Sequence, residues 1–232
     1  MKKYTYLELS GLSKVLVTFL IIGAAADAIA AYGDYLQYQL LSAIQTGEDY
    51  TQEQIDGNDL RQGAIGLLQL AVTLITAIVF LKWTYRIINN AYSIDGSSLT
   101  ISPGWGIGYY FVPIFSLWKP YQALRDAYDV LISKCAVERN QLLFSLWWAA
   151  WLISCFAGQA VFRLSLRAET IDELIVANSI TLGSDAWDFL LNLIAIMLVM
   201  HVTYACVECH ESRNSRDQFS GDIYEDDDLF ES

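Results

Sequence analysis

The residues most able to do chemistry in this chain fall into two groups, and the first is a layer of polar side chains inside otherwise apolar stretches. Ionisable and amide side chains are costly within a membrane, and they commonly mark ion or substrate sites. Two interpretations of this layer stay open: a functional site, or polar contacts that hold neighbouring helices together. Its members are Asp27, Gln69, Thr73, Gln159, Asp188 and Asn192.

The second group is a short motif of metal or redox ligands, Cys206-Val-Glu-Cys209-His210. On a helix its three ligand side chains share one face, and Cys135 could add a fourth ligand to a zinc site. The same spacing matches the attachment pattern of c-type haem. Haem is not expected, because the predicted topology places the motif in the cytoplasm, whereas covalent haem attachment belongs outside. Zinc is not expected either, because two reduced cysteines and a histidine at the inner interface are the simpler interpretation. No disulfide is expected either, since no cysteine is predicted outside the cell.

No arrangement typical of an enzyme accompanies these groups. The sequence has two histidines, and it has no serine in a nucleophile elbow, no glycine-rich phosphate loop and no HExxH sequence. We therefore expect a non-enzymatic protein. With a net charge of −12, the chain also offers no basic surface suited to nucleic acid.

The elements that must position these residues are four apolar stretches. Of the 232 residues, 54% are hydrophobic and only 17% are charged, whereas soluble domains carry about 25% charged residues. A membrane-spanning helix needs about 20 mostly apolar residues. The sequence therefore predicts an all-α integral membrane four-helix bundle, with spans at about 12–32, 62–83, 141–163 and 186–205.

The distribution of basic residues predicts the orientation of these spans. The chain has 14 Lys and Arg residues. All of them fall on the side of the two termini except Arg61, Arg163 and Arg167. Because basic residues are retained in the cytoplasm, we expect both termini to be cytoplasmic.

A segment rich in proline and aromatic residues, 102–120, separates the second and third spans and holds all 3 prolines. Its uncharged part, 104–117, would rise about 21 Å as a helix, which is short of an apolar core of about 30 Å. Pro113 would also break that helix. We therefore expect a re-entrant or interfacial segment. A cytoplasmic helix over 121–139 follows. An acidic cytoplasmic tail is expected over 206–232, and its last part, 218–232, is expected to be disordered.

The stretch from the end of the second span through this segment resembles a bacterial multi-pass membrane family, domain of unknown function 4328. The resemblance rests on Trp83, Arg86, Asn90, Pro103, Gly104, Trp105, Pro113 and Pro120. It implies a bacterial inner (cytoplasmic) membrane and a shared core of helices around the segment. It implies no activity.

Three functions are consistent with these patterns. We expect a scaffold or regulatory subunit in the lipid bilayer, either a homo-oligomer or part of a membrane complex, whose acidic tail could bind a cytoplasmic protein. The first alternative is a small channel or transporter in which 102–120 acts as the gate. The second alternative is a metal or redox site at the Cys206-Val-Glu-Cys209-His210 motif.

Overall fold

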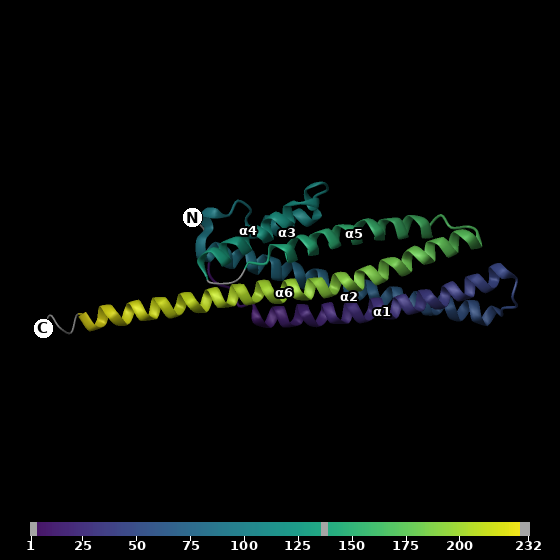
Figure 1. Ribbon diagram of the computed structural model, residues 1–232, viewed down its shortest axis with the longest axis horizontal. Helices are drawn as coiled ribbons and strands as arrows, with labels where there is room; N and C mark the ends of the chain where they lie inside the picture. Colours follow the sequence, from purple (N-terminus) through teal and green to yellow (C-terminus); the bar gives the residue numbers. More distant parts are fainter. Residues whose placement is uncertain (1–3, 136–138, 228–232) are drawn as a thin grey trace. The chain divides into compact units, whose positions relative to one another are not determined.

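The structure is a computed structural model that describes residues 4–135 and 139–227, with side chains up to Ser215. Within that part the chain is helical or irregular and contains no strand (Figure 1). The all-α class predicted from the sequence is therefore confirmed. Residues 136–138, which belong to the predicted helix 121–139, lie outside the described residues.

Long helices dominate the described part of the chain. The α-helices are α1 (Ser10–Thr46), α2 (Gln52–Asp95), α3 (Pro103–Gly108), α4 (Lys119–Lys134), α5 (Gln141–Ser165) and α6 (Ile171–Asp227). The 3₁₀ helices are η1 (Gly96–Ser98), η2 (Tyr109–Phe111) and η3 (Phe115–Leu117). Four helices, α1, α2, α5 and α6, are long and apolar enough to cross a membrane, in agreement with the four predicted spans.

Local sequence signals set the limits of these helices. Gly47 follows α1 with a φ of 77°, a left-handed conformation that glycine adopts at little cost. At the start of α2, the Thr51 hydroxyl accepts from the backbone N–H of Gln54 at 3.3 Å, and the Gln54 side chain accepts from the N–H of Thr51 at 2.8 Å. Thr170 and Glu173 make the same reciprocal capping box at the start of α6, at 3.3 and 3.1 Å.

The helix α6 continues far beyond the predicted end of the fourth span and reaches Asp227. The prediction of disorder over 218–232 is therefore wrong as far as Asp227. The sequence has no glycine or proline between Gly183 and Gly221, so nothing in its backbone interrupts helix propagation. The side chains after Ser215 lie outside the described part, and with them the predicted contact of the acidic tail with a partner.

The chain divides into two compact units. Unit 1 consists of Met1–Lys14, Leu81–Gln141 and Val199–Ser232. Unit 2 consists of Val15–Phe80 and Leu142–Leu198, so it is built from parts of α1, α2, α5 and α6. Unit 2 holds the residues of the predicted polar layer, and unit 1 holds the Cys206-Val-Glu-Cys209-His210 motif.

The proline-rich segment 102–120 belongs to unit 1, where α3, η2 and η3 pack on one another and on α4 (Figure 1). Pro103 and Pro120 lie in the first turn of α3 and α4, respectively, and both rings are buried. This is the position at which proline's missing N–H costs nothing. Pro113 lies between η2 and η3, followed by Ile114 with a positive φ of 68°. The segment is therefore a folded turn, and its re-entrant or interfacial position stays a prediction.

Candidate functional site

The candidate site is a cluster of carboxyl, amide and hydroxyl groups in the interior of unit 2, with Asp27 of α1 as one anchor. Asp27 is only 8% exposed. Gln69 of α2 donates from Nε2 to its Oδ1 at 3.2 Å, and Asn192 of α6 donates from Nδ2 to its Oδ2 at 2.9 Å. Both oxygens of this carboxylate therefore have an amide donor, which satisfies a buried anion without a basic residue.

The same cluster extends to two carboxyl groups on α6. The Nε2 of Gln69 also donates to Oδ1 of Asp185 at 3.1 Å, so one amide bridges α1 and α6. One turn further along, Asp188 accepts a hydrogen bond from the hydroxyl of Ser154 on α5. All four long helices of unit 2 thus contribute a polar group.

A further carboxyl group, Asp34, lies two turns along α1 from Asp27 and is 5% exposed. Gln62 of α2 donates from Nε2 to its Oδ1 at 3.3 Å. Asn178 of α6 donates to its backbone oxygen at 2.8 Å. The carboxyl groups of Asp34 and Asp185 lie close enough to act on one another electrostatically, which extends the cluster over about two helical turns.

Close approach of α1 to α6 requires a glycine. A Cβ added at Gly23 would lie 3.2 Å from Oδ1 of Asn192, tighter than an ordinary contact. The absence of a side chain at Gly23 therefore lets Asn192 reach Asp27 across the helix interface.

The structure brings together four of the six residues in the polar layer expected from the sequence: Asp27, Gln69, Asp188 and Asn192. It does not bring in Thr73 or Gln159, whose side chains are exposed on the outside of unit 2. Exposed polar groups on these helices have no part in the cluster, so Thr73 and Gln159 are removed from the site.

Several members of the cluster were missed by sequence reasoning, although the sequence holds a signal for them. Polar residues recur at intervals of seven, which is close to two helical turns and keeps them on one face. The intervals are Asp27 to Asp34, Gln62 to Gln69, and Asn178 to Asp185 to Asn192. Asp34 lies just beyond the predicted end of the first span at residue 32, yet the structure places it in the buried cluster.

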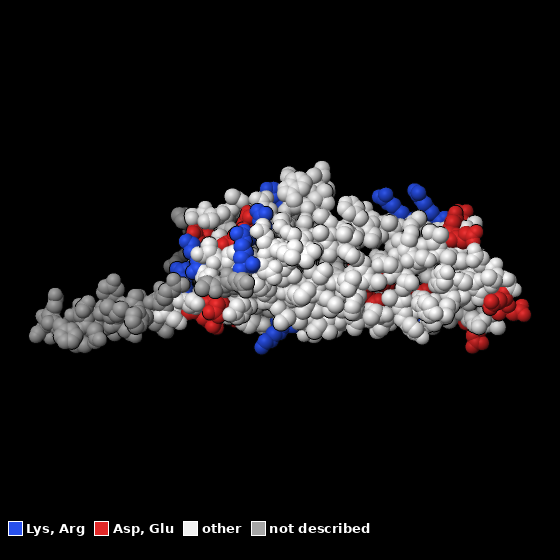
Figure 2. All heavy atoms as spheres, in the orientation of Figure 1, with Lys and Arg blue, Asp and Glu red and all other residues white. Residues whose placement is uncertain are grey.

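The charge of the cluster is not compensated by basic residues. The sequence has no Lys or Arg in 15–60, 62–81, 141–162 or 168–212, which together supply every carboxyl group of the cluster. Figure 2 shows a wide surface without charge (white) over the long helices, with small areas of acidic side chains (red) inside it. Several carboxylates in a region of low dielectric repel one another strongly, so the cluster is suited to holding a positive charge.

The second group of residues, in unit 1, contains a disulfide. Cys135, just after α4, forms a disulfide with Cys209 of α6, with a Cα–Cα distance of 5.2 Å. The expectation of no disulfide is therefore wrong, because the end of α4 lies beside α6 within the distance that a disulfide requires. Among the described residues, no three His, Cys, Asp or Glu side chains are close enough to hold one metal ion.

The other two members of the motif have separate partners. The buried thiol of Cys206 accepts from Nδ2 of Asn90 at 3.5 Å. The ring of His210 stacks on that of Tyr6 with centroids 3.6 Å apart, and burial raises the pKa of Tyr6 to about 12. Each side chain therefore has a packing role in unit 1.

The residues that carry the family resemblance organise unit 1 around its N-terminal segment. Asn90 is fully buried and pairs with both backbone groups of Leu7, accepting from its N–H at 2.8 Å and donating to its oxygen at 2.9 Å. Trp83, also fully buried, donates to the hydroxyl of Thr203 at 3.0 Å. The guanidinium of Arg86 donates to the backbone oxygen of Glu8. The side chain of Glu8 in turn accepts from Ser10 at the start of α1, and these bonds lower the pKa of Glu8.

The remaining residues of the resemblance lie in the turn between α2 and α4. Pro103 and Pro120 are buried, whereas Gly104, Trp105 and Pro113 are exposed. These residues shape the turn and its outer surface.

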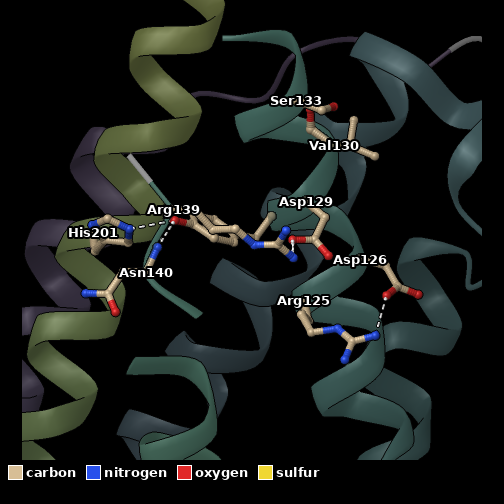
Figure 3. A network of polar contacts seen from close by, with 9 residues as sticks. Arg125, Asp126, Asp129, Val130, Ser133, Arg139, Asn140 and His201 are labelled. Atoms are coloured by element: carbon tan, nitrogen blue, oxygen red, sulfur yellow. Dashed lines mark hydrogen bonds and ion pairs between the residues drawn. The ribbon is translucent and has the colours of Figure 1, made fainter. Parts of the chain in front are cut away.

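A polar network joins α4 to α6 in unit 1 (Figure 3). The hydroxyl of Tyr128 lies 2.7 Å from Nε2 of His201 and accepts from the backbone N–H of Asn140 at 3.1 Å. Burial raises the pKa of Tyr128. Arg139 pairs with Asp129 at 2.9 Å in a half-exposed position, where an ion pair contributes little stability.

Comparison with known proteins identifies the family of the chain. The family described as "Domain of unknown function (DUF4328)" matches residues 46–204, which is more than half of the sequence. No curated protein and no solved structure matches the chain. The match covers the polar residues of α2, α5 and α6 as well as the residues 83–120 that carry the resemblance. The chain belongs to the DUF4328 family.

Proposed function

We propose that this protein is a small, non-enzymatic transporter or channel that moves a cation across a bacterial inner membrane, with both termini in the cytoplasm. The observation that carries the proposal is the buried cluster of unit 2, in which α1 and α6 supply four carboxyl groups. The amide and hydroxyl groups of α2 and α5 complete the cluster.

The cost of such a cluster argues for a function. Interhelical polar contacts in membranes contribute about 0.6 kcal/mol each on average, and uncharged amides or hydroxyls provide them. Four carboxyl groups are more than helix association needs, and their mutual repulsion works against it. A site that must attract and release a positive charge explains why carboxyl groups are present on facing helices.

Reconstitution into liposomes tests this proposal. The purified full-length protein is placed in vesicles of phosphatidylethanolamine and phosphatidylglycerol, and the fluxes of H⁺, Na⁺ and K⁺ are followed with entrapped indicator dyes. We expect a cation flux above that of empty vesicles that Asp27→Asn reduces at least tenfold. The matched control is Asp59→Asn, which removes one exposed carboxylate from α2. Absence of flux for all three cations, or equal flux in both variants, would refute the proposal.

The proposed orientation rests on the basic residues and is tested by labelling. In a background without native cysteines, Ser98→Cys reports on the predicted cytoplasmic side and Glu48→Cys on the predicted outer side; both native residues are exposed. We expect a membrane-impermeant maleimide to label only the second variant in intact spheroplasts. Labelling of Ser98→Cys from outside would reverse the orientation.

The scaffold role expected from the sequence stays a prediction. It rested on the acidic tail, whose side chains lie outside the described residues. The gate role of 102–120 and association with other copies of the chain likewise stay predictions, and the cation proposal does not depend on them.

A further inference from the structure

The inference concerns the pair Asp34 and Asp185, which face each other from α1 and α6 inside unit 2. Asp34 is 5% exposed and Asp185 is 9% exposed, so both carboxyl groups are removed from solvent. The two carboxyl groups lie close enough to act on one another electrostatically. Two carboxylates offer only hydrogen-bond acceptors, so this contact is favourable only when something positive lies between them.

The hydrogen bonds around the pair leave one oxygen without a donor. Gln62 donates to Oδ1 of Asp34, and Gln69 donates to Oδ1 of Asp185. Asn178 donates to the backbone oxygen of Asp34 and not to its carboxyl group. Oδ2 of Asp34 is fully buried and has no hydrogen-bond partner among the described atoms. A buried acceptor in this state carries the full cost of its desolvation.

Among the residues that the structure describes, the groups around the pair do not supply a positive charge. On α1 and α6 the nearby titratable groups are Asp27 and Asp188, both acids, and Asp188 acts electrostatically on the thiol of Cys155 on α5. From α2 the pair meets only the amides of Gln62 and Gln69. The basic residue next to Gln62 in the sequence, Arg61, donates to Asn58.

The same donors favour a proton over a metal ion. Na⁺ and other hard cations require about six oxygen ligands. The amides of Gln62 and Gln69 present N–H groups to the pair, and N–H groups repel a metal ion. One proton needs no further ligand, because it converts the contact of two acceptors into an O–H···O hydrogen bond. Asp27 differs from the pair, since both of its oxygens already have amide donors.

We propose that Asp34 and Asp185 together bind one exchangeable proton, and that this proton is the ion that the protein carries or to which it couples transport. The second clause rests on the proposed cation transport, whereas the binding of the proton does not. Release of the proton leaves two buried carboxylates close together, and these repel one another. Occupancy of the pair by the proton is therefore linked to the distance between α1 and α6 at this point. The pair is therefore suited to a cycle of protonation and release.

The test uses N,N′-dicyclohexylcarbodiimide, an apolar reagent that adds to a carboxyl group only when the group carries a proton. The full-length protein in liposomes is treated at pH 7, and the modified residue is identified by peptide mass spectrometry. We expect modification of Asp34 or Asp185, at one site per molecule. Asp185→Asn should lower modification of Asp34 at least fivefold, because the new amide donates a hydrogen bond in place of the proton. Asp59→Asn should leave the labelling unchanged.

Three results would overturn the proton site: no modification of either residue, modification of Asp27 alone, or protection by Na⁺ at constant pH. Labelling of the wild-type protein decides the matter even if Asp185→Asn does not fold. The two proposals remain separable. Labelling at the pair without any ion flux supports the proton site and refutes cation transport, whereas flux without labelling refutes the proton site and supports transport.

Discussion

Gly106 in α3 allows a sharp test of the packing of unit 1. A Cβ at this position would lie 2.3 Å from Cδ1 of Ile88 on α2, far inside the usual contact distance of about 3.5–4.0 Å. The clashing atom is the end of the Ile88 side chain, and because Ile88 is fully buried, that end must move against packed neighbours. Gly104, two residues earlier in the same helix, has no atom within 4 Å of its added Cβ. The two glycines therefore form a matched pair.

The expected magnitudes follow from these contacts. Overpacking costs about 1–3 kcal/mol, and a shift of more than an ångström at Ile88 places Gly106→Ala near the upper end. Alanine recovers about 1 kcal/mol of helix propensity, so the net loss in free energy of unfolding is about 2 kcal/mol. Gly104→Ala keeps the propensity gain and should stabilise by about 0.5–1 kcal/mol.

A rescue experiment separates this steric clash from other causes. Ile88→Val removes Cδ1, and alone it costs about 0.5–1.5 kcal/mol. In the Gly106→Ala background it should cost nothing or restore stability, which gives a coupling energy of at least about 1 kcal/mol. Urea unfolding in detergent micelles, followed by tryptophan fluorescence, measures all four variants. The reasoning fails if Gly106→Ala unfolds within about 0.5 kcal/mol of Gly104→Ala, or if the double variant is additive.

Three further predictions follow from the buried polar contacts. Asn90→Leu leaves the N–H and C=O of Leu7 without partners and should cost about 2–6 kcal/mol in urea unfolding, whereas an effect under 1 kcal/mol would contradict the double hydrogen bond. Tyr128→Phe should cost about 1–2 kcal/mol at pH 8. Because the pKa of Tyr128 is raised, wild-type stability should fall as the pH rises above about 10, and the variant should fall less; identical slopes would refute this. Asp27→Leu should lower the melting temperature well below that of Asp59→Leu. Equal melting temperatures would mean that the carboxyl group of Asp27 does not stabilise the fold.

Much of the fold could be predicted because it depends on local sequence. The apolar runs predict the spans, and Thr51 and Thr170 predict two capping boxes that the structure contains. The position of Pro120 predicts the start of α4. Each of these signals acts within one or two helical turns, so neighbouring residues suffice to interpret it.

The cluster of unit 2 could be predicted only in part because its contacts join distant residues. Asp34 ends an apolar run, and hydropathy alone cannot distinguish a carboxylate that faces water from one that faces another helix. The interval of seven residues from Asp27 to Asp34 carries the missing information, since it places both on one face of α1. The same limit applies to Gly106, because its role depends on Ile88, eighteen positions away.

The disulfide and the basic residues bear on the same question, the side of the membrane on which unit 1 lies. Its segments hold all but three of the 14 Lys and Arg residues, which favours the cytoplasm. Disulfides persist mainly in oxidising compartments, which favours the opposite side. Exchange, however, requires a thiolate to reach the sulfurs, and Cys135 and Cys209 are only 9% and 1% exposed. Burial slows reduction, so a disulfide here is compatible with a cytoplasmic unit 1, and the basic residues carry more weight for orientation.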